Sequence, residues 1–382
     1  RFLRGFRRIL WRIAPWRSLV WCISLGGAGH PCEMLRKLLL GAGALLSLHF
    51  LNFPFGHLTA LGIIGYAINL RFVGLVPGPR IPLSLPPPAK DTAAEVDIGK
   101  TSLTMLSHNV WCHYLQQWYA PSSSKRLAGL LSAIDKGQYD VVCVQELFIF
   151  RLGPFCISDN YKQFSHGMAR LGYTHQTDPR PSLPLLGQNN GLCIFSKLPF
   201  MSPPSSHDFT TSGELVCKKG FVHAAIEFQK APLHVVTTHM DSKKKPKNVK
   251  EIQAAQIGSA LQPLLAPASP KRQARCVVAG DFNICSRGTK DDGTQYRALK
   301  ASLAHMVDIY DGPEIAPTRR PDTKPWVRGK KKGKEGGAAI DHVFVSQGLE
   351  SDSPNVTDFR CSDGTVVSDH LGMEVELTVR TE

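Results

Sequence analysis

The stretch Val278-Ala279-Gly280-Asp281-Phe282-Asn283 places a carboxylate and a carboxamide two residues apart, directly after an apolar run. Short runs rich in β-branched residues predict buried strands. Four more polar signals follow similar runs, namely Asn109, Glu146, His239 and Ser368-Asp369-His370. A sheet gathers the ends of its strands, so we expect these five segments to build one metal-dependent hydrolytic site.

Eight short apolar runs predict the strands of this domain. They are Leu103–Leu106, Val141–Val144, Leu192–Phe195, Val222–Ile226, Leu233–Thr237, Cys276–Ala279, Ile340–Val345 and Met373–Val379. Helical patterns lie between some of them, at Lys125–Asp135 and at Val249–Leu265. Strands with intervening helices indicate a layered α/β domain, which we expect to span residues 101–382.

The first hundred residues differ in composition from the rest of the 382-residue chain. Residues 1–37 form a basic, Arg-rich segment that holds about half of the formal net charge of +14. Residues 38–76 form an apolar segment, with no Lys, Arg, Asp or Glu from Leu38 to Leu70. Residues 77–100 have the composition of a linker, with six prolines between Pro77 and Pro88.

The apolar segment predicts membrane association, and its topology remains open. A spanning helix needs about 20 apolar residues, and Pro54 and Gly56 interrupt the run near its middle. A kinked spanning helix, a re-entrant hairpin and two interfacial helices all fit this pattern, and a targeting peptide is the alternative. The preceding arginines favour the cytoplasmic side, so we expect the catalytic domain to face the cytoplasm.

Ten cysteines are scattered along the chain without a C-x-x-C pair. Cys143, Cys193, Cys217 and Cys276 fall inside apolar, strand-like runs. This placement predicts buried, reduced thiols and a reducing compartment for the catalytic part. No group of Cys and His residues has the spacing of zinc ligands, so we expect no structural zinc.

The strand-end residues have the chemistry of a hard-cation site. Mg²⁺ prefers one or two carboxylates together with substrate phosphate, so Glu146 and the carboxamide of Asn109 predict Mg²⁺ binding, with Mn²⁺ as the alternative cation. Asp341 interrupts an apolar strand and needs a charged partner when it is buried, and the imidazolium of His370 fits that need. Asn190-Gly191 predicts either a hairpin turn or an amide that binds phosphate.

Six motifs, taken in order, resemble the exonuclease–endonuclease–phosphatase superfamily, which has the fold of DNase I. They are Gln145-Glu146, Asn190-Gly191, Thr238-His239, Gly280-Asp281-Phe282-Asn283, Ile340-Asp341-His342 and Ser368-Asp369-His370. The resemblance covers about Thr101 to Glu382. It implies a four-layered α/β sandwich, in which helices flank two packed sheets and the site lies at one rim.

Within the superfamily the chain most resembles the neutral sphingomyelinases. Leu106-Ser107-His108-Asn109-Val110-Trp111 opens the domain much as in those enzymes, and Lys218-Lys219-Gly220-Phe221 is similar to their Lys-Gly strand. The apolar region before the domain is similar to that of the membrane-bound eukaryotic members. The chain departs from their pattern at His239-Met240-Asp241, at Lys218 and at Ile340-Asp341-His342.

The resemblance also implies a role for each site residue in the metal-assisted attack of water on a phosphodiester. His370 would act as the general base, with Asp341 orienting its ring. Asp281 and Asn283 would position water and phosphate, and His239 would stabilise developing charge. Asn190 and Lys219 would bind substrate. The metal ligands would be Glu146, Asn109 and Asp369. The implied substrate is membrane sphingomyelin or a related phospholipid, cleaved to ceramide and phosphocholine.

Three other functions use or retain the same residues. An endonuclease would place two lysine clusters, Lys243–Lys250 and Lys330–Lys334, on the phosphates of a nucleic acid, although these clusters also fit solvated loops. An inositol polyphosphate phosphatase would use the lysines that follow His239. A membrane-anchored adaptor on an inactive domain would lack residues such as Glu146 or His370, and the chain retains both.

Overall fold

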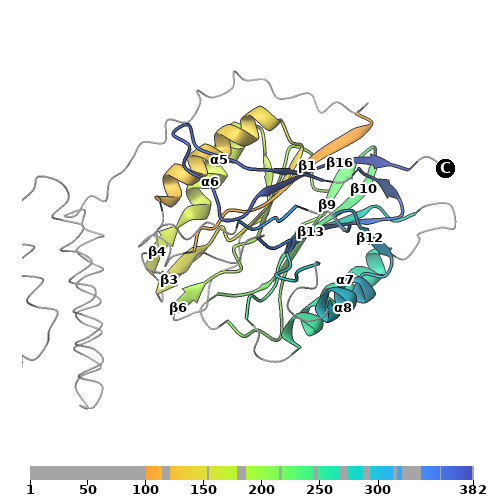
Figure 1. Cartoon of the computed structure of the whole chain (residues 1–382). Coiled ribbons are helices and arrows are strands. Elements are labelled where there is room, and N and C mark those ends of the chain that lie inside the picture. Colours follow the sequence, from red (N-terminus) through yellow and green to blue (C-terminus); the bar gives the residue numbers. More distant parts are fainter. Residues whose placement is uncertain are drawn as a thin grey trace, which may run out of the picture. The chain divides into compact units, whose positions relative to one another are not determined.

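The computed structural model describes residues 100–380, apart from 114–120, 153–154, 179–185, 215–216, 244–247, 266–272, 287–292, 313–315, 321–336 and 353 (Figure 1). The basic segment, the apolar segment and the linker predicted within residues 1–100 lie outside the described residues, apart from Lys100. The second lysine cluster and the middle of the first also lie outside them. No helix in the described part of the chain is long and apolar enough to cross a membrane.

The first large sheet has a parallel pair of strands at its centre. Its strand order is β14 (Leu349–Glu350), β16 (Gly372–Val379), β1 (Ser102–Asn109), β2 (Val141–Gln145), β7 (Cys193–Ser196) and β5 (His175–Gln176), with β15 (Asn355–Thr357) paired to β16. β1 and β2 run parallel, with Asn109 opposite Gln145, and α5 (Ser123–Gly137) lies between them in the chain. The other described pairings of this sheet are antiparallel.

The second large sheet repeats this plan. Its strand order is β12 (Met306–Asp308), β13 (Asp341–Ser346), β11 (Cys276–Asp281), β10 (Ala231–His239), β9 (Gly220–Phe228) and β8 (Ser205–Asp208). β10 and β11 are its parallel pair, with His239 opposite Asp281, and α7 (Val249–Leu265) lies between them in the chain. A small third sheet has the order β4 (Phe155–Asp159), β3 (Ile149–Leu152) and β6 (Leu186–Gln188).

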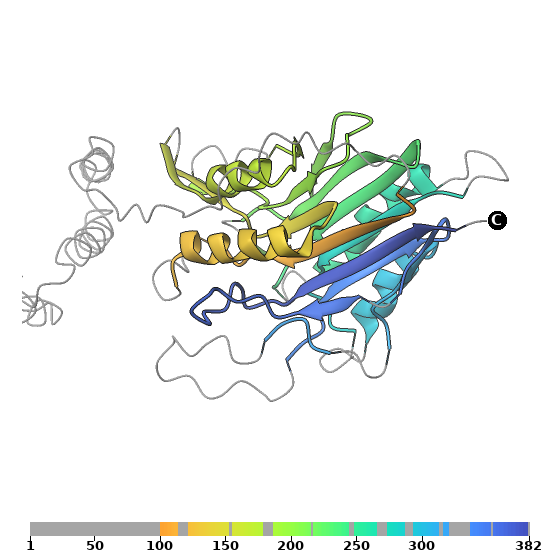
Figure 2. The same cartoon turned by 90° about the horizontal axis from the view of Figure 1, so that it is seen from above.

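Side-chain alternation along the strands divides the buried residues into three apolar clusters. Met105 of β1 and Val277 of β11 belong to the cluster between the two large sheets. Leu106 packs on the opposite face with residues of α5 and α6 (Asn160–Arg170), and Val278 packs with residues of α7 and α8 (Thr294–Ser302). The helix pairs therefore cover opposite outer faces of the paired sheets, which gives four layers (Figure 1 and Figure 2).

The observed elements confirm the predicted layered α/β domain. All eight predicted strands occur, as β1, β2, β7, β9, β10, β11, β13 and β16. α7 has the predicted bounds, and α5 contains the predicted helix, with Leu127, Leu130 and Ile134 buried at amphipathic spacing. The sequence patterns did not predict α6, α8, the small sheet or the short edge strands. Polar residues interrupt these strands, as in Ser-Ser-His-Asp of β8, so they lack the continuous apolar run that marked β2 and β7.

The described cysteines are all free thiols. Cys143, Cys193 and Cys276 are buried on β2, β7 and β11, as their apolar surroundings predicted. Burial raises the pKa of Cys143 and of Cys276 to about 12, so both thiols stay protonated and unreactive. Cys217 is also buried, but it precedes β9 and lies outside the regular strands, contrary to its predicted place in one.

The topology gathers the sequence motifs at one edge of the paired sheets. Parallel strands end at the same edge, so β1 and β2 bring Asn109 and Glu146 together, and β10 and β11 do the same for His239 and Asp281. β13 runs antiparallel to β11 and therefore begins at this edge, with Asp341 opposite Asp281. β16 runs antiparallel to β1 and begins directly after the segment that contains His370.

Candidate active site

Glu146 leaves the end of β2 in an unusual backbone conformation. Its φ of 60° lies in the left-handed region that few residues other than glycine adopt. Neighbouring hydrogen bonds fix it there, since Cys112 N donates to Glu146 O over 3.2 Å and Leu147 N donates to Gly191 O over 2.9 Å. Gly191 itself has a φ of 65°, and a Cβ there would meet the Phe148 ring at 2.7 Å. Strained backbone conformations cluster at functional sites, which is consistent with a functional role for Glu146.

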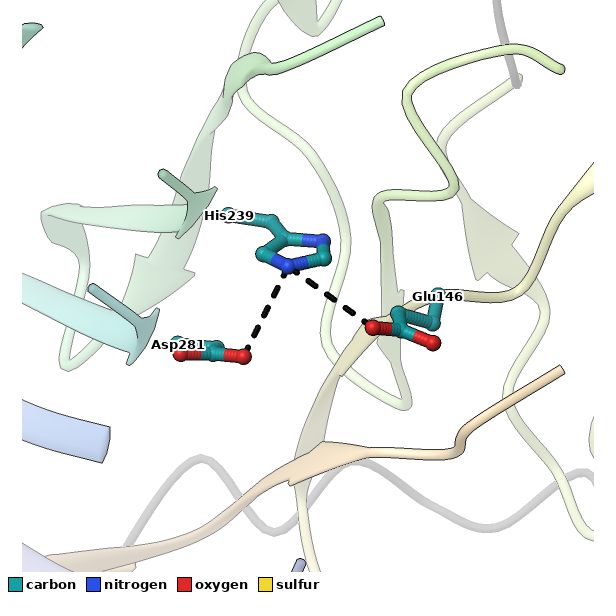
Figure 3. Close-up of side chains that lie close together, drawn as sticks. All are labelled: Glu146, His239 and Asp281. Atoms are coloured by element: carbon teal, nitrogen blue, oxygen red, sulfur yellow. Dashed lines mark ion pairs between the residues drawn. The ribbon is translucent and has the colours of Figure 1, made fainter. Parts of the chain in front are cut away.

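Glu146, His239 and Asp281 point toward one another across the two sheets (Figure 3). His239 Nε2 lies 3.8 Å from Glu146 Oε1 and 3.5 Å from Asp281 Oδ2. One ligand atom from each of the three residues lies within 4.8 Å of the others. Burial raises the pKa of Glu146 to about 7 and also raises the pKa of Asp281. The site thus holds two carboxyl groups that would gain from a nearby cation.

His370 and Asp341 form a buried dyad. His370 Nδ1 lies 2.9 Å and 3.1 Å from the two carboxylate oxygens of Asp341, and Nε2 lies 3.7 Å from Asp281 Oδ2. Ser368 fixes the dyad, because its hydroxyl donates to Asn109 O over 2.5 Å and accepts from His370 N over 3.1 Å. Although burial disfavours a charged ring, Asp341 and Asp281 raise the pKa of His370 to about 10.

Asn109 and Asp369, both predicted metal ligands, lie beside this cluster. Asn109 Nδ2 donates to Asp281 Oδ2 over 3.0 Å, and its Oδ1 accepts from Trp111 N over 3.0 Å. Asp369 Oδ2 lies 3.3 Å from Arg319 Nη2, whereas Asp369 Oδ1 is buried without a hydrogen-bond partner among the described residues. A buried carboxylate oxygen left in this way fits a cation, since buried polar atoms are normally paired.

Lys219 is the buried cation on the other side of the cluster. Its Nζ lies 2.7 Å from His239 Nε2 and 3.2 Å from Nδ1, and it lies 3.7 Å from Glu214 Oε1. Burial, followed by Lys219, lowers the pKa of His239 well below its usual value, so this ring is neutral. Lys219, rather than His239, therefore supplies positive charge at this position.

The two remaining predicted site residues, Asn283 and Asn190, are engaged by protein groups. Asn283 N donates to Asp281 Oδ1 over 2.9 Å, and Asn283 Nδ2 donates to Met240 O over 3.0 Å, so Asn283 holds the Asp281 carboxylate in place. Asn190 Nδ2 donates to Ser206 Oγ over 3.1 Å, and its Oδ1 accepts from Leu192 N. The hairpin interpretation of Asn190-Gly191 is wrong, because β6 and β7 belong to different sheets.

Comparison with known proteins assigns this site to a family. The sequence model of the endonuclease/exonuclease/phosphatase family matches residues 106–370, which include every residue of the cluster and the dyad. The chain belongs to the endonuclease/exonuclease/phosphatase family. No curated protein sequence matched the chain in a direct sequence search. The family assignment supports a phosphoester hydrolase and confirms the superfamily predicted from the six motifs.

Several solved structures share this family fold at low sequence identity. Beta toxin from Staphylococcus aureus, in a mutant with bound magnesium ions, is 18% identical with a TM-score of 0.53, over 73% of this chain and 100% of that one. Sphingomyelinase C from Streptomyces griseocarneus is 17% identical with a TM-score of 0.51, over 74% and 100%. TDP2 from D. rerio, complexed with single-strand DNA product, is 17% identical with a TM-score of 0.53, over 73% and 100%.

Two charged residues of this family member were not predicted from the sequence. Arg319 lies beside Asp369, and Glu214 lies beside Lys219. Neither follows a strand-like run, and each reaches the site from a connecting segment. Arg319 stands in a run of two arginines after Pro317-Thr318, a pattern that gives no indication of a site.

Proposed function

We propose that this protein is a divalent-metal-dependent phosphodiesterase that hydrolyses sphingomyelin, or a related phospholipid, to ceramide and phosphocholine. The observation that carries the hydrolytic part is the His370–Asp341 dyad, whose Nε2 faces Asp281 and the Glu146 cluster. The sphingomyelinase part is supported by the sequence motifs shared with neutral sphingomyelinases. The fold shared with sphingomyelinase C is consistent with it.

The donor set fits Mg²⁺ or Mn²⁺ held by carboxylates. Glu146 and Asp281 would hold the ion, and Asp369 and Asn109 would offer further oxygens. The ion, when bound, would neutralise negative charge on the phosphate and stabilise the leaving alkoxide. A hard cation prefers oxygen ligands to the imidazole nitrogen of His239. We therefore assign His239 a role beside the phosphate and not as a metal ligand.

The side chains of the site would supply proton transfer and charge stabilisation. His370 takes the proton of the attacking water at Nε2, while Asp341 holds Nδ1–H and stabilises the charged ring. That step needs a neutral ring at the start. Asp281 is one of the carboxylates that raise the pKa of His370, so a cation held by Asp281 would offset part of that effect. Lys219 places its ammonium beside His239, where it stabilises negative charge that develops on the phosphate.

A nuclease is the second candidate. The TDP2 structure with a single-strand DNA product has the same fold, and a phosphodiester in a nucleic acid presents the same group to the dyad. The apolar segment at residues 38–76 favours the lipid, because tethering at a bilayer raises the local concentration of a membrane substrate and does nothing comparable for DNA.

Phosphocholine release from sphingomyelin vesicles, measured beside plasmid nicking, tests both candidates. We expect release with Mg²⁺, none with EDTA, and a loss of at least about 10²-fold in Glu146→Ala. Glu376→Ala, which changes an exposed glutamate on β16, is the matched control and should match the wild type. Nicking without phosphocholine release would replace the lipid assignment with the nuclease.

A further inference from the structure

Backbone contacts hold Arg319 between the two segments that carry the dyad residues Asp341 and His370. Arg319 N donates to Ala338 O over 2.9 Å, and the residue also forms an isolated bridge with His370. On either side, Leu371 N donates to Thr318 O over 2.7 Å and Arg320 N donates to Asp369 O over 2.9 Å. The Cα of Arg319 is therefore fixed relative to His370, although no large sheet contains it.

The guanidinium of Arg319 uses only a small part of its hydrogen-bonding capacity. Its Nη2 lies 3.3 Å from Asp369 Oδ2, and the described residues give it no other hydrogen bond. A guanidinium carries five N–H donors in a rigid fork. The side chain of Arg319 is 44% exposed, whereas that of Asp369 is 7% exposed, so the guanidinium stays accessible while it pairs with a buried acid of the site.

The acids of the site jointly stabilise the charged form of the Arg319 guanidinium. Although burial opposes the charged form, Asp369, Asp281 and Glu146 raise the pKa of Arg319. These are the carboxylates that surround the expected position of the phosphate. Lys219, which directly precedes β9, contacts His239, so Arg319 and Lys219 approach the acid cluster from different segments of the chain.

We propose that Arg319 binds the phosphate of the substrate through its free N–H donors while Asp369 holds one side of the guanidinium. This proposal rests on the phosphodiesterase function and adds a substrate-binding residue to it. A phosphodiester carries negative charge into a site lined by Glu146, Asp281, Asp341 and Asp369, and that charge needs a cation that can reach it. Arginine suits the task because its fork contacts two phosphate oxygens at once.

The test compares Arg319→Gln and Arg319→Lys in the full chain with Arg380→Gln. Arg380 is the matched control, because it is 50% exposed and pairs with a single carboxylate, Glu350, at 3.1 Å. We measure the Kd of inorganic phosphate in the presence of Mg²⁺, the Kd of Mg²⁺ alone, and kcat and KM for bis(p-nitrophenyl) phosphate.

Arg319→Gln should weaken phosphate binding at least about tenfold and raise KM in proportion, since a hydrogen bond to a charged group is lost. Arg319→Lys should fall between Arg319→Gln and the wild type, because it keeps the charge and loses the fork. Arg380→Gln should bind phosphate as the wild type does. Unchanged phosphate affinity in Arg319→Gln, with altered Mg²⁺ affinity, would overturn the proposal and reduce Arg319 to a partner of Asp369.

The phosphate measurement needs no turnover, so it separates this inference from the proposed function. A wild-type protein that binds phosphate through Arg319 but cleaves no diester would support the contact and reject the hydrolase. A wild-type protein that cleaves the diester, with an unchanged KM and phosphate Kd in Arg319→Gln, would retain the hydrolase and reject the contact.

Discussion

His370 lies between two carboxylates, and each affects its proton differently. Asp341 accepts from Nδ1, whereas Asp281 faces Nε2 at a distance of 3.7 Å. Because Asp341 contributes most to the raised pKa of His370, Asp341→Asn should lower that pKa from its value of about 10 in metal-free protein. It should also lower kcat by about 10²–10⁴, since proton transfer loses its support.

An NMR titration of the His370 ring in EDTA, together with initial rates in Mg²⁺, checks this prediction. Asp135→Asn is the control, because Asp135 is exposed near the end of α5 and lies far along the chain from both Asp341 and His370. A His370 ring that titrates at the same pH in Asp341→Asn and in the wild type would remove Asp341 as its electrostatic partner.

Glu146 makes metal affinity depend on pH. Burial raises the pKa of this carboxyl to about 7, and a cation binds only its deprotonated form. The affinity for Mg²⁺ should therefore fall as the pH drops below about 7, by a factor that approaches ten for each pH unit. Calorimetric titration of Mg²⁺ at pH 6, 7 and 8 measures this slope. Glu146→Gln should bind Mg²⁺ weakly at all three values, and an equal slope in that variant would assign the proton to another group.

Residues at strand ends were predictable, and residues on connecting segments were not. Asn109, Glu146, His239 and Asp281 each follow an apolar run, so the sequence alone places them at the edge of a sheet. Arg319 has no such marker, because its place beside Asp369 depends on backbone contacts between segments 50 residues apart. The engagement of Asn190 by Ser206 likewise depends on packing between distant segments.

At the scale of elements, a buried ion pair joins β12 to β13. His342 Nδ1 lies 2.9 Å from Asp308 Oδ2, and Nε2 lies 2.8 Å from Ile284 O, so both ring nitrogens donate and the ring is charged. Tyr296 on α8 donates to the same Asp308 oxygen over 2.8 Å. Burial opposes both charges, yet the pairing raises the pKa of His342 and lowers that of Asp308.

The pair should stabilise the fold mainly at mildly acidic pH. The contribution of His342 is complete below the pKa of an unfolded histidine, about 6.5, and is lost as the pH rises through its raised folded value. The contribution of Asp308 to stability is complete above the pKa of an unfolded aspartate, about 3.9. It is lost as the pH falls through the lowered pKa of Asp308 in the folded protein. His342→Gln should therefore cost about 3–5 kcal/mol at pH 5.5, and less at pH 9.

Urea unfolding of the wild type and His342→Gln at the two pH values measures this difference. His305→Gln, which changes a histidine on an exposed turn after α8, should cost the same small amount at both. A penalty for His342→Gln that does not change between pH 5.5 and pH 9 would mean that the folded ring is neutral.

Strands were easier to predict than their order in the sheets. Continuous apolar runs such as those of β2 and β11 are visible in the sequence, and they indicate strands that are buried on both faces. The order of strands depends on which edges pair, and β16 at the end of the chain pairs with β1 at the start of the domain. No local pattern contains that information, so the four layers came from the family resemblance.

At the scale of the whole molecule, the basic and apolar segments predict that the active site acts at a membrane surface. Residues 1–37 would attract anionic lipids by about 1 kcal/mol per well-placed Lys or Arg, and residues 38–76 would insert into the bilayer. Tethering raises the local concentration of a lipid substrate without any new contact at the site. Removal of both segments should therefore separate membrane binding from chemistry.

Deletion of Arg1 to Val76 should abolish sedimentation with anionic liposomes and reduce phosphocholine release from vesicles. The same deletion should leave kcat/KM for bis(p-nitrophenyl) phosphate unchanged, because every residue of the dyad and the cluster lies after Lys100. Sedimentation of the full chain should persist in 0.5 M NaCl if insertion dominates and disappear if the arginines act alone, since salt screens only the latter. If the shortened chain still sediments with liposomes, the membrane contact belongs to residues 77–382 instead.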